Sequence, residues 1–356
     1  MSRTLSENHA HMDDGSCAIA RAARHDRNRW RYVRVGTVDH PRARGRHLHA
    51  RGANAMSRHR VLAHPQDLHC VVYHLLVLTT YAVAFWIYQN PSRSGITGPW
   101  SMTAFVAASS VLLAWISGTD IGINFHNHAH RPIFTSKFLN RWFGRIWTFS
   151  GGWPSYFWWH AHVTVHHSNL LHPERDWTLP RRRAGGPFEN IFLYMLAHWP
   201  WRYARHLWID FANGPRKRRN TAIRELLIFA ALWSIPFWID VKMALLLWVL
   251  PHWLANVLGM GAGMFVQHEG CVEATPARPH GHSNDHLSPV FNATSFNIGY
   301  HIEHHEYPNV HWSELPQLHA RMRDELIANG ASLQHTGYSA AAWRAYAAAC
   351  TPDFTQ

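Results

Sequence analysis

The sequence predicts an all-α membrane protein: four transmembrane helices in two hairpins, with a cytoplasmic, histidine-rich helical cap. Two observations lead to this prediction. Four segments of the 356-residue chain are apolar over nearly the length of a membrane-spanning helix. The chain also contains 31 histidines, many of them grouped just outside those segments.

The apolar segments each approach the roughly 20 residues that a helix needs to cross a hydrocarbon core. They are residues 70–88, 100–118, 222–239 and 243–266, the last interrupted by Pro251, His252 and Asn256. Buried helices of a soluble protein are the alternative interpretation. Four such segments with tryptophans near several ends favour a membrane protein instead.

Basic residues predict how these helices are oriented. The connections at 89–99 and 240–242 hold one basic residue each, whereas the segment between the second and third helices is strongly basic. The basic residues there include Arg131, Lys137, Arg141, Arg145, Arg175, Arg181 to Arg183 and the Arg216–Arg219 cluster. Because basic residues collect on the cytoplasmic side, we expect both termini and this segment in the cytoplasm. Residues 141–159 and 187–211 are not expected to cross, and the latter suits a helix lying in the membrane interface.

Residues 1–55 differ in composition from the remainder. They carry 11 Arg and 5 acidic residues, half of the net charge of +12, without an apolar period. Such a segment is predicted to be a disordered basic extension. The sequence from Met56 also suits the start of a membrane protein, so an alternative is that residues 1–55 are not part of the native protein. Residues 56–356 would form the functional domain. Since the charge excess is concentrated in this way, no nucleic-acid partner is expected.

The four cysteines are far apart and contain no C-x-x-C pair, which excludes a zinc ribbon, an ordinary cysteine-ligated cluster and a disulfide scaffold. The histidines, in contrast, form a pattern. The three clusters are His126, His128 and His130; His160, His162, His166 and His167; and His301, His304 and His305, with His268 isolated. All lie just outside apolar segments, so four crossings would bring them to one face.

The spacing within the clusters is suited to a dinuclear metal site. Residues four apart on an α-helix share a face, as in the pairs His126/His130, His162/His166 and His301/His305. Adjacent residues diverge by about 100° and can serve different ions. Imidazole suits zinc, copper, iron and nickel, but no H-E-x-x-H string of a zinc hydrolase occurs. About nine neutral ligands leave the metal charge available for anionic oxygen species, which favours iron.

The order H-x-x-x-H, H-x-x-x-H-H and N-x-G-Y-H-x-E-H-H-x-x-P resembles that of the membrane fatty acid desaturase superfamily. FNIGYHIEHHEYPNVHWSELPQL looks especially like its third histidine box, and the resemblance runs from about Leu68 to Leu326. It implies two non-haem iron ions, O2 as co-substrate and attack on an unactivated C–H bond of a lipid acyl chain.

The resemblance also implies the ligands. They would be His126, His130, His162, His166, His167, His268, His301, His304 and His305. His128 is an alternative ligand in the first box. Asp176, Glu303, Asn297 and Asn169 are candidates for supporting contacts to the ligands, whereas His160 and His172 are expected to be structural or supporting.

Similar boxes occur in lipid and alkane hydroxylases and in carotenoid ketolases, although the third box favours a desaturase. A zinc-dependent membrane hydrolase is a further alternative. A metal or haem transporter would place paired histidines within the spans, but His74 and His252 lie there without partners four residues away. The sequence lacks G-x-G-x-x-G and H-P-G-G motifs, so an external donor of the ferredoxin, rubredoxin or cytochrome b5 type is implied. Arg181–Arg183 or Arg216–Arg219 would attract it.

Overall fold

The computed structural model describes residues 61–180 and 189–350, which belong to one unit beginning at Asn54. The predicted extension and Arg181–Arg183 lie outside these residues. Within them, four helical stretches are long and apolar enough to cross a membrane. They span Asp67–Gln89, Pro99–His130, Arg216–Ile239 and Val241–His268, which confirms the four predicted membrane-length segments.

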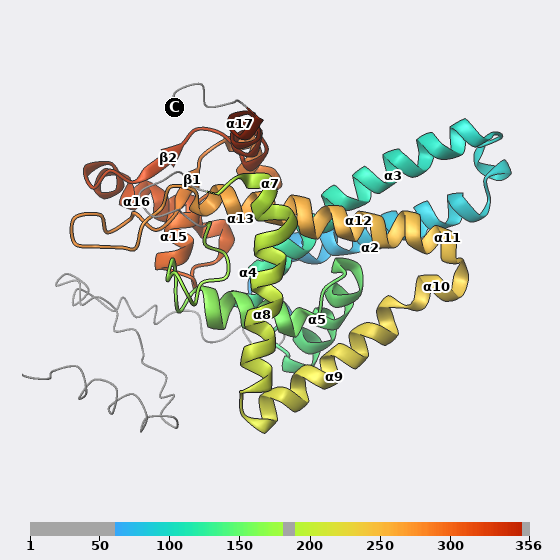
Figure 1. The fold of residues 1–356 in the computed structure, drawn as a ribbon, viewed down its shortest axis with the longest axis horizontal. Helices are drawn as coiled ribbons and strands as arrows, with labels where there is room; N and C mark the ends of the chain where they lie inside the picture. The colour runs from blue at the N-terminus through green and yellow to red at the C-terminus, as the bar shows by residue number, and fades with distance from the viewer. Residues whose placement is uncertain (1–60, 181–188, 351–356) are drawn as a thin grey trace, which may run out of the picture. The chain divides into compact units, whose positions relative to one another are not determined.

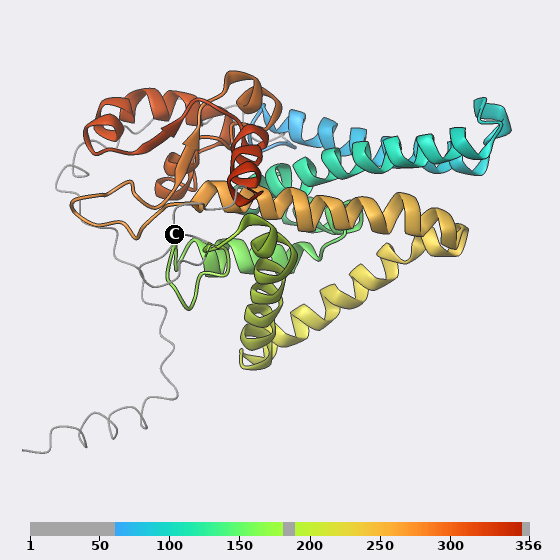
Figure 2. The same cartoon turned by 45° about the horizontal axis from the view of Figure 1, so that its top comes forward.

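The first two spans run side by side (Figures 1 and 2). Helix α2 (Asp67–Gln89) leads through a short 3-10 turn (Ser92–Ser94) into α3 (Pro99–Thr119), and the two helices contact each other. Pro99 occupies the first turn of α3, where a missing N–H costs nothing. Many of their apolar side chains face outward, as expected for helices surrounded by lipid.

The second span is longer than the sequence predicted. Helix α3 continues through a π-helical segment (Asp120–Asn124) into α4 (Phe125–His130), so the first histidine cluster lies on the same helix. The polar residues do not end the helix because they have buried partners. His74 Nδ1 donates to the Asp120 carboxylate at 2.6 Å, and Asn124 Nδ2 donates to the Cys70 carbonyl at 3.0 Å.

The fourth span likewise continues through π-helical segments, and its polar residues also have buried partners. Helices α9 (Arg216–Trp233) and α10 (Ile235–Ile239) precede a continuous stretch that ends at His268. This stretch comprises α11 (Val241–Ala244), α12 (Leu250–Trp253) and α13 (Gly261–His268), joined by π-helical segments Leu245–Val249 and Leu254–Met260. The polar interruptions are again paired: His252 Nε2 donates to the Ser150 carbonyl at 2.7 Å, and Asn256 Nδ2 donates to the Gly151 carbonyl at 3.1 Å.

The helices between the second and third spans do not meet the criteria for a membrane span, in agreement with the prediction. They are α5 (Lys137–Gly151), α6 (Ser155–Trp159) with the π-helical segment His160–His166, and α7 (Ile191–Leu193) with Tyr194–His198 and α8 (Trp199–Ala212). Both α5 and α8 contact α9. Trp147, Trp177 and Trp199 are fully buried in the core between these elements and α13.

The C-terminal part gathers at the end of α13 (Figures 1 and 2). It consists of β1 (Asn284–His286), α14 (Pro289–Thr294), α15 (His301–Glu306), a 3-10 turn (Trp312–Glu314), α16 (Leu315–Ala328), β2 (Ser332–Gln334) and α17 (Tyr338–Cys350). β1 and β2 pair in parallel, with Asn284 opposite Ser332. The all-α prediction missed this short sheet because its strands are 48 residues apart and only three residues long.

Candidate metal centre

Four separate elements bring the histidines together. The first cluster ends α4, and the second lies in the π-helical segment after α6 and at the residue that follows it, His167. His268 ends α13, and the third cluster lies in α15. All nine predicted ligands fall within groups whose potential ligand atoms lie within 4.8 Å of one another. The groups are His126, His130, His162, His167 and His304; His166, His167 and His305; and His268, His301 and His305.

These groups overlap through His167 and His305, so they form one continuous centre. The His162 and His167 Nε2 atoms lie 3.1 Å apart, and those of His301 and His305 also lie 3.1 Å apart. For a metal–imidazole bond of about 2.1 Å, two nitrogens at a right angle lie about 3.0 Å apart, and at the tetrahedral angle about 3.4 Å. The nitrogen spacing therefore fits coordination of shared ions.

The protonation state of the imidazoles suits metal binding as well. Burial, reinforced by neighbouring imidazoles, holds the pKa of His162, His304 and His305 well below the usual histidine value. The pKa values of His167 and His301 are lowered for the same reasons. Neutral imidazoles present the lone pair that a metal needs. This all-nitrogen donor set fits divalent transition metals, including iron.

One predicted pairing is wrong. His162 and His166 were expected to converge because they are four residues apart, yet His162 groups with His167. The local helix explains this: the His167 N–H donates to the His162 carbonyl, a π-type bond across five residues. The wider turn places residues five apart above one another. His166 therefore points toward His268 and His305.

Asp176 lies behind His166. His166 Nδ1 donates to the Asp176 carboxylate, at 3.0 and 3.1 Å from its two oxygens, and Leu171 and Thr178 donate their backbone N–H groups to the same carboxylate. Burial opposes ionisation of Asp176, but His166, His268 and the Thr178 N–H hold its pKa below the usual value. The carboxylate therefore fixes the His166 tautomer with Nε2 available to a metal.

Two further contacts support the ligands and were not predicted from the sequence. Thr178 Oγ1 lies 3.0 Å from His166 Nδ1 and donates to Asp176, and its position two residues after that aspartate was the available signal. His268 Nδ1 donates to the backbone carbonyl of His282 at 3.1 Å. A backbone carbonyl leaves no mark in the sequence, so this second contact is visible only in the structure.

Several candidates lie away from the centre. His128 packs between Phe125 and Trp147, on the other side of α4 from His126 and His130. Asn169 Nδ2 donates to the Val165 carbonyl. His160 Nε2 donates to Asp210 at 2.9 Å, and His172 accepts from the Glu174 N–H, which are structural contacts.

Glu303 and Asn297 also make contacts other than those predicted. The fully buried Glu303 accepts a hydrogen bond of 2.5 Å from His319 on α16, because its side chain leaves α15 on the side opposite the imidazole centre. Asn297 has a left-handed backbone (φ 58°) and donates to the Trp312 carbonyl at 3.1 Å. Neither contacts a candidate ligand among the described residues.

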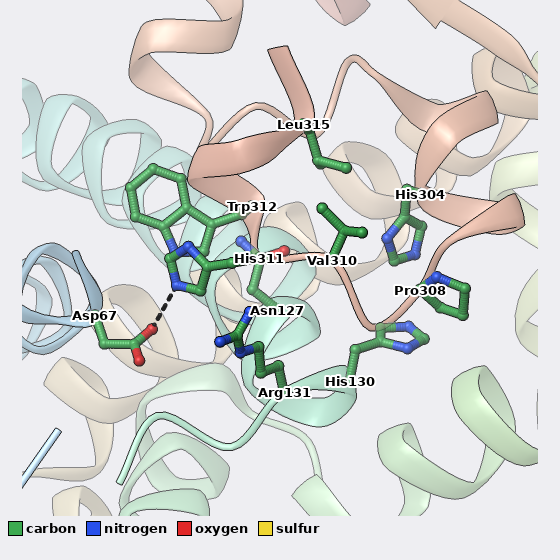
Figure 3. Close-up of a pocket in the computed structure, with 10 residues that line it drawn as sticks. All are labelled: Asp67, Asn127, His130, Arg131, His304, Pro308, Val310, His311, Trp312 and Leu315. Atoms are coloured by element: carbon green, nitrogen blue, oxygen red, sulfur yellow. Dashed lines mark hydrogen bonds and ion pairs between the residues drawn. The ribbon is translucent and has the colours of Figure 1, made fainter. Parts of the chain in front are cut away.

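A small pocket borders the centre beside His130 and His304 (Figure 3). Its volume is about 10 Å³, enough for one water molecule. Three buried nitrogens without a hydrogen-bond partner in the described part of the chain belong to residues that line it: Asn127 Nδ2, His130 Nε2 and Trp312 Nε1. The pocket suits water and is far too small for an acyl chain.

Four membrane-length helices and nine converging imidazoles define a class, the helical membrane proteins with a polyhistidine centre that could hold metal ions. The chain belongs to the fatty acid desaturase family, whose profile matches residues 99–337. The matched range includes all three histidine clusters and His268. No curated protein and no solved structure matches the chain.

Proposed function

We propose that this protein uses O2 and electrons from an external donor to desaturate a lipid acyl chain at a histidine-ligated di-iron site. The observation that carries the proposal is the convergence of nine imidazoles from four elements, at spacings that fit shared metal ions. Membership of the fatty acid desaturase family supports an oxidoreductase acting on lipid.

The imidazoles divide between two ions. His126, His130, His162 and His304 would hold one, His166, His268, His301 and His305 would hold the other, and His167 lies between them. Iron bound there supplies the activation of O2 and the removal of hydrogen from an unactivated C–H bond. Burial holds the pKa of ligands such as His162 well below the usual value, and Asp176 orients His166, so bound ions would retain most of their positive charge.

We further propose that the centre and both termini face the cytoplasm. His130 and His268 end two different membrane-length helices, and these helix ends meet in the centre. The basic connections lie on the same side as these ends, whereas residues 89–99 hold a single basic residue. The exposed basic residues Arg216, Lys217 and Arg219 would steer an acidic ferredoxin, rubredoxin or cytochrome b5 type donor.

The proposal is tested by expressing the chain with a donor system and analysing cellular lipids by mass spectrometry. A product that has lost two hydrogen atoms indicates desaturation, and one that has gained an oxygen atom indicates hydroxylation. Purified protein should contain about two iron ions per chain, and alanine at His166, His304 or His305 should abolish product formation. Zinc as the only bound metal, or full activity of those variants, would overturn the proposal.

A further inference from the structure

A second cavity lies on the other side of α4 from the metal centre. This crevice, of about 290 Å³, lies between α4, α5, α6 and the first part of α9. Its inner wall includes Phe125 and His128, whereas His126 and His130 of the same helix belong to the imidazole centre. Helix α4 therefore separates the crevice from the candidate metal ions, and a ligand here would not be the reacting chain.

The crevice has an excess of positive charge. Three guanidinium groups, those of Arg141, Arg145 and Arg224, line it together with a single carboxylate, that of Glu225. Glu225 accepts hydrogen bonds from Arg145 at 3.1 Å and from Arg224 at 3.0 and 3.1 Å. The Arg141 guanidinium has no ion-pair or hydrogen-bond partner in the part of the chain that the structure describes.

One carboxylate cannot compensate three guanidinium groups, so two positive charges remain. Guanidinium groups match the geometry of phosphate oxygens and bind them through paired hydrogen bonds. Arg141 and the outer side of Arg224 are exposed, so both remain accessible to a ligand. The lining therefore suits a phosphate group.

The surroundings of the crevice suit a position at a membrane surface. Arg224 and Glu225 belong to the first half of the candidate span Arg216–Ile239. Exposed aromatic residues flank the crevice on α5 and α6: Phe138 is 65%, Trp142 47% and Trp159 40% exposed. The Arg145 guanidinium also lies over the Trp142 ring, 4.9 Å from its centroid. Aromatic rings beside arginines are typical of the headgroup level of a bilayer.

We propose that this crevice binds the headgroup phosphate of an anionic phospholipid, whose chains lie along the exposed apolar side of α9. Leu226 and Leu227, next to Glu225, offer such a surface. The arginines would hold the phosphate, and the aromatic side chains would pack beside the glycerol region. The site does not depend on the iron chemistry, so the test of lipid binding is independent of the test of desaturase activity.

The test is native mass spectrometry of the full-length protein released from nanodiscs of mixed phosphatidylglycerol and phosphatidylcholine. We expect bound phosphatidylglycerol in excess of its share in the nanodisc. The double variant Arg141→Gln/Arg224→Gln should lower that enrichment by about tenfold. The matched control Arg321→Gln/Arg323→Gln removes the same charge from exposed positions of α16 and should keep the enrichment.

Further measurements distinguish a specific phospholipid site from non-specific lipid binding and from binding of free phosphate. If the double variant does not fold, Arg141→Gln is measured alone, because it breaks no ion pair among the described residues. This single variant should also lower the enrichment of phosphatidylglycerol. Equal retention by wild type and variant, or equal binding of phosphatidylcholine, would overturn the proposal. Complete displacement of the lipid by millimolar inorganic phosphate would also overturn it, since the site would then bind free anions.

Discussion

Side-chain direction on α4 separates two histidines that look alike in the sequence. His126 points into the imidazole centre, whereas His128, two residues later, packs against Phe125 and Trp147. Residues two apart on a helix point to nearly opposite sides. Whether a histidine of the first cluster can bind a metal ion therefore depends on the side of α4 from which it projects.

The two variants His126→Ala and His128→Asn make a matched pair. We expect His126→Ala to lose at least one bound iron per chain. Asn at 128 keeps an acceptor for the Ile133 N–H, which His128 Nδ1 accepts at 3.4 Å, and should retain both ions. Iron analysis of the purified proteins checks this, and equal loss in both variants would contradict the assignment.

Asp176→Asn tests the contact behind His166. The amide keeps the shape but replaces a charged acceptor, so the His166 tautomer is no longer enforced. Replacing such outer contacts typically lowers metal affinity by about 10- to 100-fold. Iron affinity measured by competition with a chelator should fall in that range, and the nearby exposed Glu174→Gln should leave it unchanged. Unaltered affinity of Asp176→Asn would count against the contact.

At the scale of the element, the π-helical segment His160–His166 decides which imidazoles meet. Its five-residue bond brings His162 and His167 to one group, where an α-helix would pair His162 with His166. The sequence offers no reliable signal for this register, because π-type turns depend on the surrounding packing.

Inserting one alanine after Thr164 should place His162 and His167 six residues apart, a spacing that neither an α-helical nor a π-type turn brings to one face, and so misplace the following imidazoles. We expect a folded, helical protein that has lost most of its iron. Thr164→Ala keeps the register and should bind iron normally. Circular dichroism and iron analysis of both variants provide the measurements, and an insertion variant with full iron content would refute the role of the π-type turn.

A second element-scale feature is the link between α15 and α16. Asp285 accepts the Ile302 N–H at 2.8 Å, and Glu303 accepts from His319. Burial alone would lower the pKa of His319, but hydrogen bonds to Asp285 and Glu303 raise it to about 9. The pKa of Asp285 is raised to about 7, first by burial and then by Glu303.

Both shifts predict that stability falls as the pH rises. A histidine with a raised pKa stabilises the fold fully below 6.5, its unfolded value, and loses this contribution as the pH passes about 9. Asp285 acts in the same direction between 3.8 and about 7. The apparent thermal midpoint of detergent-solubilised protein should therefore decline between pH 6.5 and pH 9. His319→Gln should flatten the decline, and an unchanged slope would argue against the link.

At the scale of the whole molecule, an even number of crossings would keep all histidine-bearing helix ends on one side. A cysteine-labelling experiment tests this. In a variant lacking Cys17, the exposed Cys350 is the accessible cysteine of the described residues, because Cys70 and Cys271 are buried. We expect Cys350 to react with a membrane-impermeant maleimide only after the membrane is opened. A cysteine at Ser92, in the connection between α2 and α3, should react in intact cells, and the reverse pattern would overturn the orientation.

The sequence by itself determined the number of membrane-length helices, and its family resemblance predicted nine histidine ligands, all of which lie in the groups of converging imidazoles. Both depend on local patterns: about 20 consecutive apolar residues for a span, and short histidine spacings for a ligand cluster. Local composition also showed that residues 141–159 and 187–211 were unsuited to cross.

Only the tertiary structure decided which imidazoles meet, which carboxylate supports them and where a second ligand would fit. Asp176 contacts His166, but Glu303 turns to His319, although both were equal candidates in the sequence. The crevice beside α4 joins Arg141 to Arg224, 83 residues further along the chain. Contacts of this kind depend on how helices pack and on which face each side chain leaves, and neither is encoded in the composition of one segment.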